Sequence, residues 1–329
     1  MNILVTAPLH HIIKQKKQLK KMYDCNFLNH NEHYKINKLL KYNKGWICSP
    51  SPTKLISKKN YPNIKYLSFI ATPSTGTNHI SDEIKKDKKI KILSISLSKK
   101  INLIKASSEY TFALALNLIK KISIAEKYVK KGFWRNVEDE LRSDELFQKK
   151  VGIIGFGRIG KNILNYSNVF GMRSIIYDPN VKKNNYNFIK NLKRIKNECD
   201  LIFICINLNK KNVNFIDKKF FLELKRKPFF INTSRGEVVD EKALLTALKL
   251  NLVRSAAVDV LAGEQKLRLF KNNLVKYSLK HPEKLLITPH IAGLTYQSES
   301  RAIEIIMELI NKQFKIKNEK FIRNFSYNL

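Results

Sequence analysis

Acidic residues are scarce in this sequence. Among its 329 residues, 27 Asp and Glu stand against 62 Lys and Arg, which gives a formal net charge of +35 at pH 7. Such an excess of positive charge can favour binding to nucleic acids, to anionic membrane surfaces or to small anionic substrates. The lysines are scattered through every segment, as a coding sequence rich in A and T would give, and no basic motif with interleaved aromatic residues accompanies them. We therefore expect no nucleic-acid partner, and at most a field that steers small anions.

Long hydrophobic runs are also missing. No stretch approaches the ~20 uncharged apolar residues that span a bilayer, so no membrane association is predicted. The run Met1–Pro8 lacks the basic region and the long apolar region of a signal peptide, and it is better interpreted as a buried first strand. These two absences predict a cytoplasmic protein.

Cysteine is rare, with four in the chain: Cys25, Cys48, Cys199 and Cys205. They form no CxxC pair and show no His/Cys spacing suited to zinc, so no metal site is predicted. In a reducing compartment we expect free and mostly buried thiols. No internal repeat at a fixed period is present either.

What the chain does contain is an alternation of short apolar runs with longer amphipathic segments. Its length allows about two domains. Strands that alternate with helices predict an α/β fold in which parallel sheets are covered by helices on both faces. The predicted strands lie at 3–6, 46–48, 66–70, 92–96, 151–154, 174–177, 201–206, 228–232, 256–260 and 285–288, and the clearest predicted helices lie at 9–22, 106–122, 159–170 and 296–314.

A glycine-rich turn with the sequence GFGRIG directly follows the strand predicted at 151–154 and opens a helix. Its first glycine allows a tight turn, its second lets the backbone approach a pyrophosphate, and its third lets the helix pack close to the sheet. A bare GxGxxG is common by chance, but this context is the one that a dinucleotide site needs. We expect the turn and the N–H groups of the helix start to bind the pyrophosphate through Gly155, Gly157, Arg158, Ile159 and Gly160.

An acidic residue, Asp178, stands at the end of the next predicted strand. A carboxylate there can accept hydrogen bonds from the adenosine ribose hydroxyls, and it would repel the 2′-phosphate of NADP. The sequence therefore predicts NAD as the cofactor. Arg173, Lys182 and Lys183 leave the strictness of this preference open, because a nearby cation can relax it.

Three chemically competent residues follow in order along the second half of the chain: Arg235, Glu264 and His290. An arginine at a strand end can bind a carboxylate with two parallel hydrogen bonds. A histidine paired with a carboxylate can move a proton, because the carboxylate favours the protonated imidazole. Each residue taken alone is more often an ordinary surface or structural residue, so the prediction depends on the set.

These motifs closely resemble those of the D-isomer-specific 2-hydroxyacid dehydrogenases, the family that includes D-3-phosphoglycerate dehydrogenase. The resemblance covers nearly the whole chain and includes STGT at 74–77, SE at 108–109, the glycine turn, NTSRG at 232–236, DVLxxE at 259–264 and PHIxG at 289–293. The chain departs from the family at Cys205, where members often have His, and at Asn207 and Gln265, where they often have Pro. These departures leave the shape of the nicotinamide pocket open.

The resemblance implies a role for each residue of the trio. His290 would be the general acid/base that protonates the substrate carbonyl oxygen during reduction. Glu264 would hydrogen-bond this imidazole. Arg235 would bind the substrate carboxylate and polarise the carbonyl group.

Further binding residues also follow from the resemblance. Thr233 and Asp259 would bind the cofactor, Asp259 at the nicotinamide end. Backbone N–H groups near Thr75 and Gly76 would hold the substrate carboxylate from the other domain.

The expected architecture is two Rossmann-like domains with a cleft between them. The substrate-binding domain is predicted to be discontinuous, formed by 1–104 and 296–329, and the NAD-binding domain is predicted to span 105–295. Helices near 106–122 and 296–314 would form a hinge whose closure excludes water. The resemblance also implies a homodimer formed mainly through the cofactor domain.

The predicted activity is hydride transfer between NAD and a small D-2-hydroxy or 2-oxo acid. D-3-phosphoglycerate is the first candidate, followed by glyoxylate, hydroxypyruvate or a longer sugar acid. The alternative is an NADH-responsive interaction scaffold like the corepressors related to this family, which keep the same fold and trio. The basic charge mildly favours the scaffold, but no added recognition segment supports it.

Overall fold

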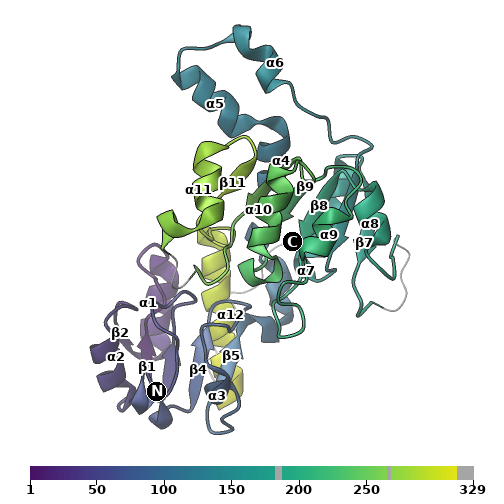
Figure 1. Cartoon of the computed structure of the whole chain (residues 1–329). Helices are drawn as coiled ribbons and strands as arrows, with labels where there is room; N and C mark the ends of the chain where they lie inside the picture. The colour runs from purple at the N-terminus through teal and green to yellow at the C-terminus, as the bar shows by residue number, and fades with distance from the viewer. Residues whose placement is uncertain (182–186, 265–267, 317–329) are drawn as a thin grey trace. The chain divides into compact units, whose positions relative to one another are not determined.

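The computed structural model describes residues 1–181, 187–264 and 268–316. The chain divides into two compact units (Figure 1). Unit 1 consists of Met1–Ile104 together with the C-terminal segment that begins at Thr295, and unit 2 consists of Lys105–Leu294. Each unit contains one parallel sheet with helices on both faces, so the predicted α/β class is confirmed.

Unit 1 contains a five-stranded parallel sheet with the order β2-β1-β3-β4-β5. Its strands are β1 Asn2–Val5, β2 Asp24–Phe27, β3 Gly45–Ile47, β4 Phe69–Thr72 and β5 Lys91–Ser94. Its helices are α1 Ile13–Met22, α2 His33–Leu40, α3 Asp82–Lys85 and α12 Tyr296–Phe314, with 3-10 turns at Pro62–Tyr66, Ile95–Leu97 and Lys99–Leu103. Side chains alternate across the strands: Ile3 and Val5 pack toward α1 and α12, whereas Leu4 packs toward α2.

Helix α12 belongs to unit 1 although it lies far along the chain, and Figure 1 shows it in yellow beside β4 and β5. Its buried residues Ile303, Ile306 and Ile310 recur at helical spacing and join the core that includes Ile3 and Val5. The apolar stripe therefore explains why the C-terminal helix packs onto the N-terminal sheet.

Unit 2 contains a six-stranded parallel sheet with the order β11-β10-β9-β8-β6-β7. Its strands are β6 Lys150–Ile154, β7 Arg173–Tyr177, β8 Leu201–Ile204, β9 Phe229–Asn232, β10 Ser255–Val258 and β11 Leu285–Ile287. Its helices are α4 Ala106–Lys120, α5 Ile122–Lys130, α6 Glu138–Leu141, α7 Arg158–Val169, α8 Lys193–Glu198, α9 Lys218–Leu222, α10 Glu241–Lys249 and α11 Asn273–Lys280, with 3-10 turns at Arg135–Val137, Gly236–Val238 and Leu269–Lys271.

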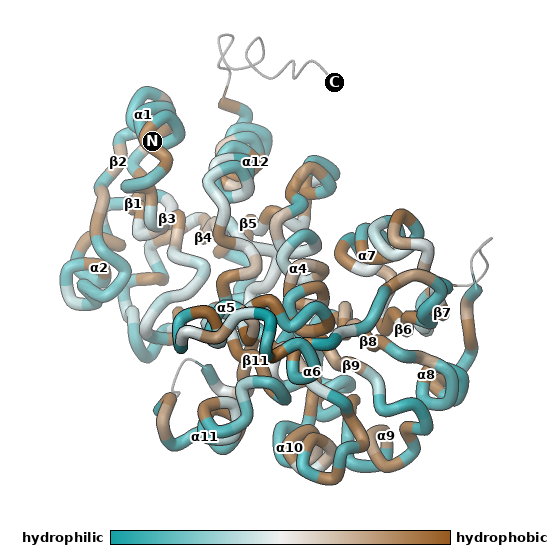
Figure 2. The backbone as a smooth tube through the Cα atoms, turned by 90° about the horizontal axis from the view of Figure 1, so that it is seen from above, coloured by the Kyte–Doolittle hydropathy of each residue, from teal (hydrophilic) through white to brown (hydrophobic). Residues whose placement is uncertain are grey.

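The sheet of unit 2 has a separate core on each face. Leu201 and Phe203 pack in the core that α4 and α7 cover, whereas Ile202 and Ile204 pack in the core that α9 and α10 cover. Brown and teal residues alternate along α10 and α11 in Figure 2, as expected for helices with one buried face. Because all strands are parallel, their carboxyl ends lie at one edge, where such sheets place their ligands.

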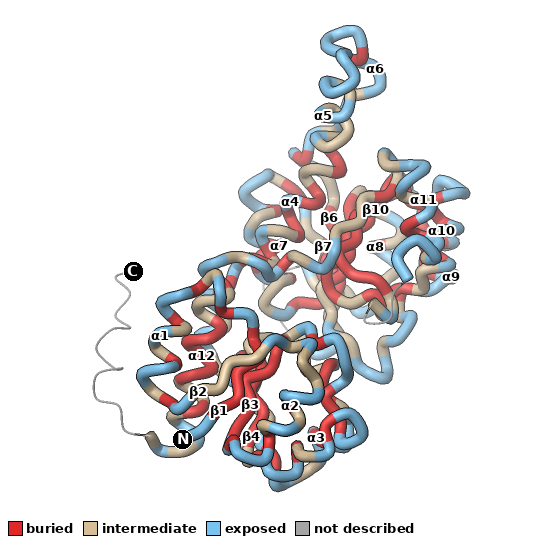
Figure 3. Tube along the Cα trace, turned by 90° about the vertical axis from the view of Figure 1, so that its left-hand side faces the viewer, coloured by how far each residue is buried: buried red, intermediate tan, exposed pale blue. Residues whose placement is uncertain are grey.

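Helices α5 and α6 form an arm that reaches away from the sheet of unit 2 (Figures 1 and 3). Neither helix contains a buried residue. The single helix predicted at 106–122 is wrong in its last residues, because Lys121 has a left-handed backbone with φ of 56° and separates α4 from α5. Asn117 stabilises this break by accepting hydrogen bonds from the Ser123 N–H (2.9 Å) and hydroxyl (2.9 Å).

Other predicted boundaries also shift. The strand predicted at 66–70 is Phe69–Thr72, because Pro62 favours a 3-10 turn over Pro62–Tyr66 just before it. The helix predicted at 9–22 begins only at Ile13. Strand β2 was not predicted, since the polar edge sequence DCNF has no apolar alternation.

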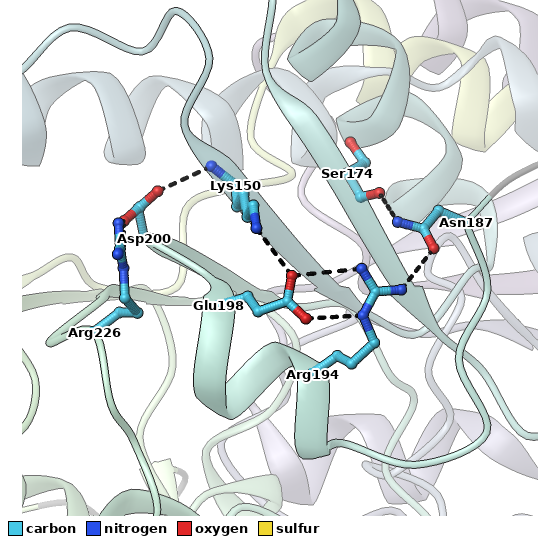
Figure 4. Close-up of polar contacts among 7 residues, drawn as sticks. All are labelled: Lys150, Ser174, Asn187, Arg194, Glu198, Asp200 and Arg226. Carbon is cyan, nitrogen blue, oxygen red and sulfur yellow. Dashed lines mark hydrogen bonds and ion pairs between the residues drawn. The ribbon is translucent and has the colours of Figure 1, made fainter.

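An ion-pair network joins elements at the amino end of the unit 2 sheet (Figure 4). Lys150, the first residue of β6, donates from Nζ to Glu198 Oε2 (2.9 Å) and from its backbone N–H to Asp200 Oδ2 (3.0 Å). Arg194 Nε donates to Glu198 Oε1 (2.9 Å), and Arg226 Nη2 donates to Asp200 Oδ1 (3.0 Å). Hydrogen bonds from Arg194 and Lys150 lower the pKa of Glu198 to about 2. The network thus fixes the starts of β6 and β8, whose opposite ends lead to the candidate site.

The four cysteines are free, with Cys48 and Cys199 buried and Cys25 and Cys205 partly exposed. Burial raises the pKa of the Cys48 and Cys199 thiols to about 12. Within the described ranges, no helix combines the length and apolar character needed to cross a membrane. The same residues contain no group of His, Cys, Asp or Glu placed to hold a metal ion.

Candidate active site

The glycine turn lies at the carboxyl end of β6, where it leads into α7. Gly155 has φ of +98°, and a Cβ there would lie 2.6 Å from the Cys205 carbonyl oxygen, so only glycine fits. A Cβ at Gly160 would lie 2.1 Å from the Gly155 carbonyl oxygen, which shows how closely α7 packs against the turn. At Gly157 no heavy atom lies within 4 Å of the Cβ position, so this side of the turn is open. The turn therefore has the shape that a pyrophosphate requires.

The start of α7 supports this interpretation. Arg158 and Ile159 are its first two residues and are partly buried. The first backbone bond of the helix runs from Lys161 N–H to Gly157 O (3.0 Å), so the N–H groups of Ile159 and Gly160 have no intrahelical acceptor. Burial lowers the pKa of the Arg158 guanidinium, which nevertheless stays charged at neutral pH. N–H groups and a positive helix end are thus available to an anion.

Asp178 follows β7, beside the glycine turn. Its Oδ2 accepts a hydrogen bond from Phe156 N–H (2.8 Å), and its Oδ1 accepts one from Asn180 N–H (2.9 Å). Each carboxylate oxygen keeps acceptor capacity for a ribose hydroxyl. Arg173 begins β7 and so lies a strand length away, roughly 15 Å at the usual rise per residue. The preference for NAD over NADP stays a prediction, and Lys182 and Lys183 lie outside the described residues.

The Arg235 loop is shaped by the side chain of Asn232, the last residue of β9. Asn232 Oδ1 accepts hydrogen bonds from Ser234 N–H (3.0 Å) and Ser234 Oγ (2.8 Å), and Asn232 Nδ2 donates to the Arg235 carbonyl oxygen (3.1 Å). Arg235 itself is partly exposed, and its Nη1 donates to the Ser234 carbonyl oxygen (2.6 Å). The loop is therefore preorganised around an arginine that can reach a ligand.

Thr233 points into unit 2. Its hydroxyl lies 2.6 Å from that of Thr111 in α4, and Thr111 Oγ1 donates to the Ser107 carbonyl oxygen (2.5 Å). Thr233 must then be the donor of the pair, because Thr111 has only one hydroxyl hydrogen. The hydroxyl anchors the Arg235 loop to α4, and the cofactor contact of Thr233 stays a prediction.

The segment after Arg235 holds the loop that carries Glu264. A Cβ at Gly236 would lie 2.0 Å from the Leu261 carbonyl carbon, so the two backbones touch. Glu241 Oε1 accepts a hydrogen bond from Ala262 N–H (2.6 Å), and Glu237 Oε1 accepts one from Gly263 N–H (3.0 Å). The loops of Arg235 and Glu264 are therefore held together by direct backbone packing and by these two hydrogen bonds.

Asp259 holds the third loop, which carries His290. The carboxylate is only 1% exposed and accepts hydrogen bonds from Thr288 Oγ1 (2.6 Å), Ile291 N–H (3.0 Å) and Ala292 N–H (2.9 Å). Its observed task is thus to position the loop on both sides of His290. Its predicted contact with the nicotinamide stays a prediction.

His290 and Glu264 are brought together. His290 Nδ1 lies 2.6 Å from Glu264 Oε1, and the two side chains remain 40% and 35% exposed. His290 has a left-handed backbone with φ of +56°, an uncommon conformation that functional sites often hold in place. With Nδ1–H donated to the carboxylate, Nε2 is the ring nitrogen left for a substrate.

In unit 1, Thr75 and Gly76 lie in the loop after β4. Thr75 is exposed, and Ser74 Oγ donates to the Gly76 carbonyl oxygen (2.8 Å). Among the described residues, the N–H groups of Thr75 and Gly76 have no hydrogen-bond acceptor. They are therefore available to an anion.

Several residues that shape the site were not predicted to take part. Asn232, Glu237 and Glu241 stand inside or next to the Arg235 motif, but their partners are distant in the sequence or need loop geometry to be seen. A carboxylate that accepts from backbone N–H groups gives no periodic signal in a sequence.

Comparison with known proteins assigns the chain to a family. The model of the D-isomer specific 2-hydroxyacid dehydrogenase NAD binding domain matches residues 112–292. Erythronate-4-phosphate dehydrogenase of Bacteroides thetaiotaomicron is 31% identical over 258 residues, which are 76% of this chain and 64% of that protein. D-3-phosphoglycerate dehydrogenase of Methanocaldococcus jannaschii is 27% identical over 318 residues, which are 95% of this chain and 57% of that protein. The chain thus spans 64% and 57% of the lengths of these two relatives.

A solved structure has the same fold. D-lactate dehydrogenase of Aquifex aeolicus, complexed with NAD and lactic acid, superposes with a TM-score of 0.80 at 24% identity and covers 96% of each chain. The match extends over both units and confirms the two-domain Rossmann-like fold. With an NAD-binding domain model that spans the glycine turn, Arg235, Glu264 and His290, the chain belongs to the D-isomer-specific 2-hydroxyacid dehydrogenase family.

Proposed function

We propose that this protein is an NAD-dependent oxidoreductase that transfers a hydride between the nicotinamide and a small D-2-hydroxy or 2-oxo acid. The observation that carries the proposal is the His290–Glu264 pair at 2.6 Å, held in a unit that also presents an open glycine turn. Family membership supports the same reaction class.

The residues supply what this reaction needs. When bound, the cofactor supplies or accepts the hydride at the substrate carbon. His290 Nε2 gives a proton to the carbonyl oxygen during reduction and removes it during oxidation, a contribution worth ~10²–10⁴ in rate. Glu264 accepts the Nδ1–H bond and stabilises the charged imidazole. Arg235 binds the substrate carboxylate and polarises the carbonyl group.

Two further binding contributions belong to the proposal. The N–H groups of Thr75 and Gly76 bind the substrate carboxylate. Asp178 accepts bonds from the adenosine ribose and selects NAD over NADP. The open side of Gly157 and the close packing at Gly155 and Gly160 support a dinucleotide pyrophosphate at the turn.

D-3-phosphoglycerate is the substrate that we propose to test first. Both curated relatives described above carry the name of a phosphorylated hydroxy acid, whereas the similar solved structure is a D-lactate dehydrogenase. The candidate substrates share a carboxylate and a carbonyl group and differ in the size and charge of the rest of the molecule. An assay must therefore compare substrates that differ in this part.

The direct test is an absorbance assay of NADH oxidation by the purified protein with a panel of 2-oxo acids. Glyoxylate, pyruvate, hydroxypyruvate, 3-phosphohydroxypyruvate and an aromatic 2-oxo acid form the panel, with NADPH in parallel. We expect turnover on at least one member and its loss in Arg235→Ala. NADH binding without turnover on any member would contradict the enzymatic proposal and favour the interaction scaffold.

We also propose a homodimer built through the arm of unit 2. Its residues Ile122, Val129 and Trp134 are 57%, 52% and 73% exposed, and Figure 2 shows brown residues along α5. Apolar side chains on an arm without a core of its own need a partner surface, and a second copy provides one symmetrically. The cytoplasmic location remains a prediction of the sequence.

A further inference from the structure

His79 lies buried beneath the loop that carries Thr75 and Gly76. It is 4% exposed, and its Nε2 lies 3.0 Å from Thr72 Oγ1 at the end of β4. Thr72 Oγ1 lies 2.8 Å from Ser74 Oγ, and Ser74 Oγ donates to the Gly76 carbonyl oxygen (2.8 Å). Four groups thus form one unbroken chain from the interior of unit 1 to the loop.

The direction of every bond in this chain follows from the number of hydrogens available. A carbonyl oxygen only accepts, so the single hydroxyl hydrogen of Ser74 is used on Gly76. Thr72 must then donate its own hydroxyl hydrogen to Ser74. Thr72 has no hydrogen left for the imidazole, so it accepts from His79, which must carry a hydrogen on Nε2.

The surroundings of the imidazole are compatible with this direction, because an uncharged thiol can accept a hydrogen bond as well as donate one. Cys48 Sγ lies 3.7 Å from the same Nε2, and burial raises the pKa of its thiol to about 12, so the sulfur is uncharged at neutral pH. Thr72 and Cys48 are completely buried, which excludes water as a competing partner and makes an unpaired group costly.

We infer that His79 is a positioning residue that orients the Thr75–Gly76 loop for the substrate carboxylate through the directed chain His79 to Thr72 to Ser74 to Gly76. The chain holds the Gly76 carbonyl toward the protein, while the N–H groups of Thr75 and Gly76 have no acceptor among the described residues. A donor pair held in advance binds an anion without first ordering the loop. The binding of a substrate carboxylate in this inference rests on the proposed function, whereas the chain of hydrogen bonds does not.

The direction of the hydrogen-bond chain is tested first in the wild-type protein, without substrate. Long-range proton–nitrogen NMR spectra of protein labelled with ¹⁵N-histidine report which ring nitrogen carries a hydrogen. We expect the His79 Nε2 to be protonated. A bare Nε2 with hydrogen only on Nδ1 would overturn the inference, whatever the protein catalyses.

The functional consequence is tested with two variants at the same position. His79→Leu removes the donor, whereas His79→Gln keeps an N–H donor at a similar reach. With the 2-oxo acid that wild type reduces fastest, we expect His79→Leu to raise KM roughly tenfold, the order of one lost buried hydrogen bond. The affinity for NADH should be unchanged in His79→Leu. The KM of His79→Gln should lie close to that of wild type.

The matched control is His281→Leu, because His281 is an exposed histidine of unit 2. It should leave KM unchanged. Equal KM values in wild type and a folded His79→Leu would overturn the role of the chain while leaving the proposed function intact. A protonated Nε2 in a protein that reduces no 2-oxo acid would instead contradict the proposed function and leave the chain standing.

Discussion

At Gly236 the backbone of the Arg235 loop lies against the backbone of residues 261 and 262. No side chain fits there, since a Cβ would lie 2.0 Å from the Leu261 carbonyl carbon and 2.1 Å from the Ala262 nitrogen. The atoms in the way are backbone atoms of the Glu264 loop and cannot rotate aside. The absence of a side chain at Gly236 therefore allows the Arg235 loop and the Glu264 loop to pack directly against each other.

Gly236→Ala should separate the Arg235 and Glu264 loops. We expect kcat/KM for the 2-oxo acid to fall by about 10²-fold, a typical effect of misplacing catalytic groups by about an ångström. NADH affinity, measured by fluorescence titration, should change little because the glycine turn is untouched. Normal turnover in Gly236→Ala would contradict the locking of the two loops.

The carboxylate of Asp178 is expected to decide between NADH and NADPH. Asp178→Ser removes the charge that opposes a 2′-phosphate but keeps an acceptor for the Phe156 N–H. The ratio of kcat/KM for NADH to that for NADPH should fall by at least roughly tenfold, which is one carboxylate–phosphate repulsion of ~1.4 kcal/mol. An unchanged ratio in steady-state assays would show that Asp178 does not select the cofactor.

At the scale of elements, the network around Glu198 connects the start of β6 with α8 (Figure 4). The pKa of Glu198 is lowered from 4.5 to about 2 in the folded protein. A carboxylate with a lowered pKa stabilises the fold above its unfolded pKa and loses this contribution as the pH falls through its folded pKa. Its contribution is therefore complete above pH 4.5 and disappears toward pH 2.

Glu198→Gln should lower the Tm at pH 6, and the difference from wild type should shrink between pH 4.5 and pH 2. Thermal unfolding followed by circular dichroism measures both values. The matched control is Glu283→Gln, whose partner His281 lies at 3.6 Å on the surface. A Tm difference that stays constant across this pH range would contradict the assigned ion pairs.

Elements were predictable from the sequence where their residues repeat with a clear period. The strand 151–154 and the helix 296–314 have continuous or helical apolar patterns, and the structure has them at Lys150–Ile154 and Tyr296–Phe314. The polar edge strand β2 and the break at Lys121 have no such pattern, because pairing and a left-handed residue decide them.

The candidate site was predictable to the same degree. Sequence motifs pointed to His290, Glu264 and Arg235, and in the structure His290 forms a pair with Glu264. The hydrogen bonds of Asp259 and His79 could not be predicted, because they depend on which backbone groups and side chains the folded loops bring within hydrogen-bond distance. Sequence motifs mark the proposed reacting groups better than the groups that hold them.

At the scale of the whole molecule, the arm of unit 2 predicts an assembly of two chains. Trp134→Glu places a charge on its most exposed large apolar side chain, which is 73% exposed. The variant should shift the mass measured by light scattering from dimer to monomer at micromolar concentration. Tyr34→Glu changes an aromatic residue of unit 1 that is 82% exposed and should leave the mass unchanged. A monomeric wild type, or a dimeric Trp134→Glu, would contradict the assembly through this arm.

We propose that His290 serves hydride transfer to C2 of a 2-oxo acid. The most direct measurement follows deuterium from NADH that carries deuterium at both C4 positions into the product of the best substrate, by NMR and chiral chromatography. For wild type we expect one deuterium at C2 and the D configuration, and for His290→Ala a rate lower by at least ~10²-fold. Product without deuterium at C2, product of the L configuration, or an undiminished rate in His290→Ala would contradict it.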